Sequence, residues 1–466
     1  MFLRVRNQWL KMKRRLSSLL PGGILFFSAV LLTGVEQSAT TRAAWADCDS
    51  CKMILLPQAG SAKIDQQISQ AQKQVKGAAG DPAPYLEKLG WLYVSKARLS
   101  NDPGYYKLAE QTALCLTRLN ADAVEALLLR GHVFHSLHKF KEAEVLARQL
   151  VKKRGASFDF GLLGDVLMEQ GALTEAVSAY QKMIDLKPDL HSYSRAAHLR
   201  WLKGDVEGAI ELMKMAAQAS SPLDPESAAW THSRVAFYLF QTGRRAEAVR
   251  WVEAALKFQP DYPAALLLRG RIELADGKTP AAIEILSKAC ELNPLPEYQW
   301  LLADALAAAG RNAEVRELES RLEKRGASDD PRTFALFLAT RDQQVGKALQ
   351  LAKDELKSRA DVFTHDALAW ALWRSREMDA ARREMQLALS EGTRDGRLFF
   401  HAAVIALEAG QNAEAADWQQ KAEALQQMLF PSERQQLNQM KSRLAAKTGS
   451  NSVTAKLTAP RNTPIP

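Results

Sequence analysis

The amino-acid sequence predicts an all-α protein, a right-handed α-solenoid of about ten helix–turn–helix repeats. The chain after residue 46 has no long alternation of apolar and polar residues, which is the pattern of a half-buried strand. Short helical segments alternate with turns instead, and Gly, Ala and Pro recur at a spacing of 34 residues. A length of 466 residues would suggest about three domains, but stacked repeats form one elongated domain.

The chain begins with a basic segment followed by an apolar one. Six Lys or Arg precede the largely apolar core 24–35, whose 12 residues suit a secretory signal better than a membrane span. Ala44 and Ala46 flank Trp45 in the small-x-small pattern of a cleavage site, so residues 1–46 are predicted to be a signal peptide. Because this site lies far from the apolar core, an uncleaved anchor in the inner membrane is the alternative. Both interpretations place the body of the protein outside the cytoplasm, in the periplasm or secreted.

The net charge of +9 is concentrated in this leader. Residues 1–46 contain seven Lys or Arg and one acid, a net +6, which leaves only +3 for the other 420 residues. Binding to a phosphate backbone needs a cationic stripe, and a nearly neutral surface does not supply one. We therefore expect no nucleic-acid partner, and a membrane contact only if the leader is retained.

Four cysteines occur in the chain. Cys48 and Cys51 form a CxxC pair just after the predicted cleavage site, where Asp47 and Asp49 would disfavour a reactive thiolate. No second ligand pair follows at zinc spacing, and no His follows Cys51 as haem attachment would require. We expect Cys48 and Cys51 to form a small structural disulfide in an oxidising compartment. Two further cysteines within helical segments are expected to be small buried apolar residues, Cys115 and Cys290.

The repeat is defined by residues that recur at constant spacing. The pairs 34 residues apart are Gly243 and Gly277, Ala248 and Ala282, Ala255 and Ala289, and Pro260 and Pro294. Small residues let helix axes approach closely, and the proline stops the second helix before the next unit. This unit resembles the tetratricopeptide repeat, a 34-residue helix–turn–helix motif whose copies stack into a superhelix.

The repeats divide the chain into segments. After the leader, we predict a linker with the CxxC pair and a short helix at 47–82, the solenoid at 83–429, a polar capping helix at 430–447, and a disordered tail at 448–466.

The resemblance implies that the first helix of each repeat lines the concave surface. The residues at the corresponding positions are mostly aromatic: His132, His135, His198, Trp201, Trp230, Phe237, Phe240, Trp300, Phe363, Trp370, Trp373 and Phe400. Exposed aromatic side chains are typical anchors for a peptide or an amphipathic helix. The alternative is that several of them complete the core between neighbouring repeats.

The resemblance also allows a comparison with one ligand specificity known in this family, the binding of a peptide's terminal carboxylate. Some tetratricopeptide repeats grip a peptide's terminal carboxylate with Lys, Asn and Arg, whereas the matching positions here hold His132, Asp165, His198 and Phe237. That specificity is not predicted for this chain.

No pattern in the sequence predicts catalysis. His132, His135 and His138 are spaced three apart without a further ligand nearby, so a surface histidine cluster is favoured over a metal site. The chain contains no phosphate-binding loop, GxSxG or HExxH motif. We therefore predict a non-catalytic scaffold without cofactor or metal, which binds a protein or peptide ligand in its concave groove. The alternatives are a membrane-anchored assembly factor and a redox or metal enzyme that uses Cys48, Cys51 or the histidines.

Overall fold

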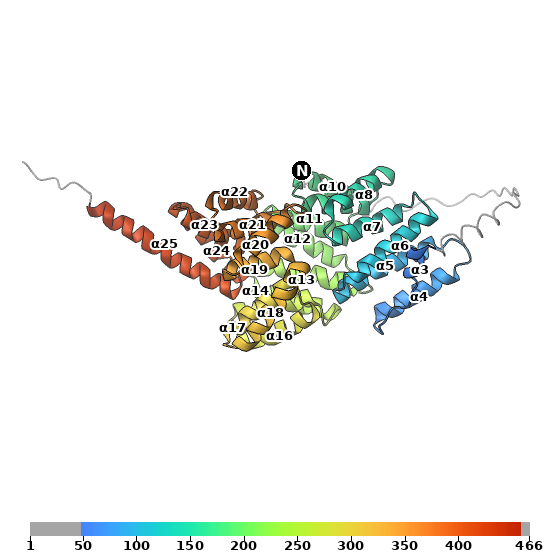
Figure 1. Ribbon diagram of the computed structural model, residues 1–466, viewed down its shortest axis with the longest axis horizontal. Coiled ribbons are helices and arrows are strands. Elements are labelled where there is room, and N and C mark those ends of the chain that lie inside the picture. Colours follow the sequence, from blue (N-terminus) through green and yellow to red (C-terminus); the bar gives the residue numbers. More distant parts are fainter. Residues whose placement is uncertain (1–47, 458–466) are drawn as a thin grey trace, which may run out of the picture. The chain divides into compact units, whose positions relative to one another are not determined.

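The structure is a computed structural model that describes residues 48–457, and all the regular elements of this part of the chain are helical (Figure 1). The predicted leader, 1–46, lies outside the described residues, as does the end of the predicted tail, 458–466. Two helices, α3 (Asp49–Met53) and α4 (Lys63–Gly77), come before the repeats. The predicted all-α solenoid is therefore confirmed.

Ten helix pairs make up the repeats between Ala83 and Ala424. They are α5 (Ala83–Ser100) with α6 (Gly104–Leu119), α7 (Val124–Ser136) with α8 (Phe140–Lys153), α9 (Ser157–Glu169) with α10 (Leu173–Leu186), α11 (Leu190–Leu202) with α12 (Val206–Gln218), α13 (Pro225–Gln241) with α14 (Arg245–Phe258), α15 (Pro263–Ala275) with α16 (Thr279–Leu292), α17 (Pro296–Ala308) with α18 (Asn312–Asp329), α19 (Pro331–Arg341) with α20 (Val345–Leu356), α21 (Val362–Arg374) with α22 (Met378–Leu389), and α23 (Gly396–Glu408) with α24 (Asn412–Ala424).

Small residues at the recurring positions bring the helices of a pair together. A Cβ atom on Gly164 of α9 would overlap the ring of Tyr180 on α10, so the glycine leaves the space that this ring fills. The repeated alanines Ala248, Ala282 and Ala289 are completely buried. The 34-residue pattern thus corresponds to close packing between helices.

A second set of contacts joins repeats that lie far apart in sequence. The amide of Ala360, just before α21, donates to the carbonyl oxygen of Glu169 at the end of α9, at 3.0 Å. The hydroxyl of Thr393, just before α23, donates to the carbonyl oxygen of Leu202 at the end of α11, at 2.5 Å. The turns of the third and fourth pairs therefore touch the segments that lead into the ninth and tenth. We call these the inter-turn contacts, because they join successive turns of the superhelix.

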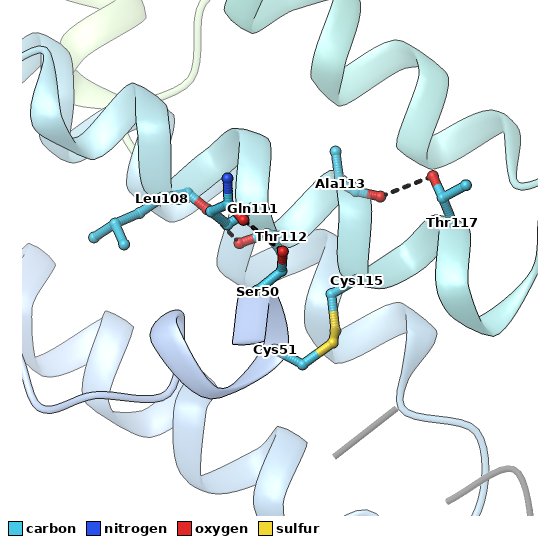
Figure 2. The surroundings of a disulfide bond; sticks show 8 residues. All are labelled: Ser50, Cys51, Leu108, Gln111, Thr112, Ala113, Cys115 and Thr117. Carbon is cyan, nitrogen blue, oxygen red and sulfur yellow. Dashed lines mark hydrogen bonds between the residues drawn. A yellow bond between two sulfur atoms is a disulfide. The ribbon is translucent and has the colours of Figure 1, made fainter. Parts of the chain in front are cut away.

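The segment before the repeats is attached by a disulfide that the sequence did not predict. Cys51 of α3 is bonded to Cys115 of α6, with Cα atoms 5.4 Å apart (Figure 2). The hydroxyl of Ser50 also donates to Oε1 of Gln111 on α6, at 2.5 Å. The predicted Cys48–Cys51 disulfide is wrong, because α3 turns Cys51 into the core against α6 and leaves Cys48 free.

The other two cysteine predictions have different outcomes. Cys115 is buried as expected but is bonded to Cys51. Cys290 is buried and free, which confirms its prediction.

The last helix is longer than predicted. After the short 3-10 helix η2 (Gln426–Met428), α25 runs from Pro431 to Leu457, so the helix continues through residues expected to be disordered. No proline interrupts the sequence between Pro431 and Pro460, which allows the helical hydrogen bonds to continue. Within residues 48–457, no helix combines the length and apolar character needed to cross a membrane.

Candidate functional site

The first helices of eight consecutive repeats surround one cavity, which we call the inner cavity. Its volume is about 400 Å³. Its lining residues come from α9 to α23 and from the segments around them: Met168, Glu169, His198, Trp201, Leu202, Arg234, Phe237, Arg271, Glu297, Arg332, Thr333, Leu336, Arg359, Asp361, Phe363, Asp366, Asp395, Arg397, Met428 and Phe430. The expected concave surface is therefore present, but it encloses a cavity of small-molecule size.

Arginine side chains over aromatic rings form much of the cavity wall. The guanidinium of Arg234 lies 4.8 Å from the ring centroid of Phe237, and that of Arg271 lies 5.5 Å from the centroid of Phe430. Arg397 lies 5.0 Å from the centroid of Phe430 as well. Such cation–π contacts hold the planar guanidinium groups in fixed orientations.

Four of the five lining arginines are paired with carboxylates. Arg332 bonds both oxygens of Asp361, at 2.8 and 3.1 Å. Arg359 lies 2.7 Å from a carboxylate oxygen of Glu169. Two further pairs are Arg397 with Glu433, and Arg271 with Glu297 at 3.8 Å. Burial is the largest influence on Asp361 and raises its pKa, but the charges of Arg332 and Arg359 and the hydrogen bonds from Thr364 together outweigh burial and lower the pKa of that carboxyl.

Arg234 differs from these four. Its guanidinium lies over three aromatic rings, those of Trp201, Phe237 and Tyr238. Within the described part of the chain, its side chain donates one hydrogen bond, to the hydroxyl of Tyr238 at 3.3 Å. Among residues 48–447, no carboxylate oxygen lies within 4.0 Å of it. Since a guanidinium carries five N–H donors, most of its hydrogen-bonding capacity is not used by the described protein groups.

Three more polar groups complete the electrostatics of the cavity. Burial, followed by the nearby charge of Arg234, lowers the pKa of His198 to about 4, so the imidazole is neutral at neutral pH. Asp395 accepts hydrogen bonds from the backbone amides of Arg397 and Leu398 at the start of α23. Burial raises the pKa of Asp395. Asp366 lies 2.8 Å from the buried imidazole of His401.

Four of the predicted groove residues line the inner cavity: His198, Trp201, Phe237 and Phe363. The ring of Trp201 stacks on that of Phe363, and its indole N–H donates to Gln241 at 2.7 Å. For these four residues, the expected position on the inner face agrees with the structure.

Four others are completely buried, and their predicted exposure in a groove is wrong. Phe240, Trp300, Trp370 and Phe400 have 0% exposure. Trp300 packs against Phe430, with ring centroids 5.0 Å apart. Trp370 stacks on His401 at 3.8 Å. These rings fill the gaps between neighbouring first helices. A difference of one residue between the predicted and the actual helical register moves a side chain by about 100° around the axis, which is enough to turn it from the groove into the core.

The remaining predicted residues lie apart from the cavity. Trp230 is 38% exposed at the start of α13, and Trp373 is half-buried, stacked on Trp370. His132 and His135 are half-buried, and the ring of His132 contacts Trp91 edge to face. Burial, followed by the charge of His135, lowers the pKa of His132 to about 3. Over the part of the chain that the structure describes, no group of three or more His, Cys, Asp or Glu comes together as metal ligands.

The cavity arginines were missed in the sequence. Only one signal could have pointed to Arg234, which precedes the predicted groove residue Phe237 by three positions and so shares its helix face. Arg332 and Arg397 are each the second residue of their helix, whereas Arg271 lies near the end of α15 and Arg359 lies between α20 and α21. Their convergence depends on the fold.

The fold and its cavity define an α-helical repeat protein whose first helices face inward. Residues 128–191, 162–225 and 238–295 match a family model described as tetratricopeptide repeat. These parts of the chain are therefore tetratricopeptide repeats, as the sequence pattern predicts.

Solved structures with a similar course of the chain include three repeat proteins. A human IFIT1 dimer with PPP-AAAA is 16% identical, with a TM-score of 0.41 over 70% of this chain and 77% of that chain. Cut9 in the APC/C hetero-tetramer Cut9–Hcn1 is 13% identical, with a TM-score of 0.34 over 85% and 98%. Yeast Tom70 is 15% identical, with a TM-score of 0.34 over 84% and 98%. The comparison with curated proteins gives no match.

Proposed function

We propose that this protein is an exported, non-catalytic interaction scaffold that takes an extended segment of a partner protein into its inner cavity. The observation that carries the proposal is the convergence of eight first helices on one cavity with aromatic side chains in its wall. Tetratricopeptide-repeat scaffolds bind protein partners, and aromatic groups offer a large contact area at low entropic cost.

The size of the cavity limits what it holds. A volume of about 400 Å³ accommodates the tip of an extended chain, a few side chains long, but not an α-helix of 10–12 Å diameter. Of the two ligands that the sequence suggested, an extended segment is therefore favoured over a helical one.

The export part of the proposal rests on two independent features. The first 46 residues have the basic and apolar order of a secretory signal. The Cys51–Cys115 disulfide suits an oxidising compartment such as the periplasm. Amino-terminal sequencing separates this proposal from the membrane-anchored alternative: a start at Asp47 supports cleavage and export, whereas a retained Met1 supports an anchored assembly factor.

Photo-crosslinking tests segment capture. A benzoylphenylalanine placed at Phe237 lies at the cavity wall, and one placed at Trp230 lies on the exposed part of the same helix. In the native envelope, we expect a light-dependent adduct with one partner protein from position 237 and none from position 230. Adducts from position 230 alone, in proteins with normal melting curves, would contradict capture in the cavity.

A further inference from the structure

We propose that Arg234 anchors a carboxylate-binding subsite in the inner cavity, which recognises one carboxylate on the captured segment. This inference rests on the proposed function and adds the chemistry of the bound group. It concerns a position distinct from the Lys, Asn and Arg clamp of other tetratricopeptide repeats, whose matching residues are absent here.

The geometry of Arg234 is that of a prepared anion site. Trp201, Phe237 and Tyr238 hold the guanidinium plane, with centroid distances of 5.9, 4.8 and 5.0 Å. Rings that cover the face of a guanidinium leave its N–H groups to donate at the edge, where a carboxylate binds through two parallel hydrogen bonds. The single bond to Tyr238 uses one nitrogen of the group.

The ion pairs around the cavity leave one arginine available to an anionic ligand. Arg332, Arg359, Arg397 and Arg271 each have a carboxylate partner. Among the described residues, Arg234 is then the one arginine of the lining that has no carboxylate within 4.0 Å. Five carboxylates line the cavity as well, and two of them are held by other groups, Asp366 by His401 and Asp395 by backbone amides. A carboxylate therefore suits the local charge of Arg234, whereas a phosphate dianion would bring a second negative charge close to these carboxylates.

The surroundings of Arg234 strengthen its attraction for an anion. The half-buried His198 stacks on Trp201 and is neutral at neutral pH, so its ring can donate a hydrogen bond without adding a second charge. The apolar rings of Phe237 and Phe363 exclude water from part of the wall, and charge-assisted hydrogen bonds are stronger where water is excluded. The cavity therefore suits a carboxylate attached to an apolar neighbour.

Calorimetry with defined probes tests this inference. The probe is acetyl-Phe-Glu-amide, and its neutral control is acetyl-Phe-Gln-amide, which has the same shape. We expect the acidic dipeptide to bind about 10- to 100-fold more tightly, because one charge-assisted bidentate contact distinguishes the two. Equal affinities in the wild-type protein would overturn the proposal, and this comparison requires no variant to fold.

Variants assign the effect to Arg234. Arg234→Gln should abolish the preference for the acidic dipeptide, and Arg234→Lys should retain part of it as a point charge. The matched control is Arg245→Gln, at a surface arginine of α14 that pairs with Asp276 at 3.2 Å, and it should leave the preference unchanged. A preference that persists in a folded Arg234→Gln protein would contradict the assignment.

Further probes distinguish the source and charge of the ligand. Acetyl-Phe-Gln with a free carboxyl end tests a terminal carboxylate, and stronger binding than acetyl-Phe-Glu-amide would support that source. Phenylacetate that binds when neither dipeptide does would overturn the assignment to a protein segment, and tighter binding of phenyl phosphate would overturn the single-charge argument. If crosslinks from position 237 form while the acidic and neutral dipeptides bind equally, the carboxylate subsite fails and segment capture stands.

Discussion

The indole ring of Trp201 stacks on the phenyl ring of Phe363, with centroids 5.6 Å apart and planes inclined by 18°. The first residue belongs to the fourth repeat and the second to the ninth, so the contact joins two turns of the superhelix at the wall of the inner cavity. Beside it, the inter-turn contacts join the third pair to the segment before the ninth and the fourth pair to the segment before the tenth. The cavity therefore depends on how closely successive turns approach.

The closeness of this approach can be tested at Gly204. Its φ of 77° favours glycine, and a Cβ atom there would overlap the carbonyl oxygen of Gly392. Gly243 has a φ of 79° but no atom within 4 Å of its Cβ position. We expect Gly243→Ala to cost about 1 kcal/mol for the backbone alone, and Gly204→Ala to cost about 1–3 kcal/mol more because the turns must separate. Urea unfolding measures the free energy of unfolding of both variants. Equal decreases would show that the two turns can move apart at Gly204 with little cost.

The buried tryptophans provide a second test. Trp370 is completely buried and its indole N–H donates to Thr340 at 3.1 Å. We expect Trp370→Ala to lower the free energy of unfolding by about 3–5 kcal/mol, because it leaves a large cavity in the core. Trp230→Ala should change it by about 0.5 kcal/mol or less, since that ring is 38% exposed. Similar melting temperatures for the two variants would argue that Trp370 belongs to an open groove after all.

The disulfide gives a third prediction. Non-reducing peptide mapping should recover Cys51 linked to Cys115, with Cys48 free. Replacing both bonded residues with alanine should destabilise the protein by about 2–4 kcal/mol, because the unfolded chain loses a crosslink over 64 residues. Cys48→Ser serves as the control and should unfold like the wild type. A peptide that links Cys48 to Cys51 would refute the pairing in the structure.

His198 predicts a dependence of stability on pH. Its pKa is about 4 in the folded protein and about 6.5 when unfolded, so the unfolded chain binds the proton more tightly. The stabilisation is therefore complete above pH 6.5 and is lost as the pH falls towards 4, by about 1–2 kcal/mol for this half-buried ring. We expect His198→Gln to lose stability less steeply over this range.

The difference in unfolding free energy between the wild type and His198→Gln isolates the contribution of this histidine. Burial raises the pKa of Asp304 to about 6, so that its ionisation destabilises the fold as the pH rises from about 4 to 6, the opposite direction. Asp304 is present in both proteins and cancels in the difference of their unfolding free energies. Parallel curves for wild type and His198→Gln would contradict the lowered pKa.

Much of the fold could be predicted because its pattern is local. Gly243 and Gly277, or Ala255 and Ala289, mark the same place in successive helix pairs, and each pair is formed by residues close in sequence. The helical extension to Leu457 was not predicted from the sequence. The absence of proline there permits a helix, but no pattern of residues in that segment indicates one. The general position of the inner face was also predictable, as Trp201 and Phe237 show.

The details of the candidate site required longer-range information. Trp370 and Phe363 belong to one helix, yet one is core and the other lines the cavity, because neighbouring helices cover its faces unequally. Arg271 and Arg397 approach Phe430 from different repeats, and no spacing in the chain records that meeting.

The sequence alone determined that the protein is a stack of about ten helix pairs after a basic amino-terminal segment, since helix formation and pair packing depend on residues within a few turns of one another. Only the tertiary structure decided that Cys51 pairs with Cys115 and that Arg234 faces an inner cavity. The physical reason is cumulative: each repeat rotates slightly relative to the last, and the sum of these rotations brings Trp201 to Phe363. No single repeat encodes that sum.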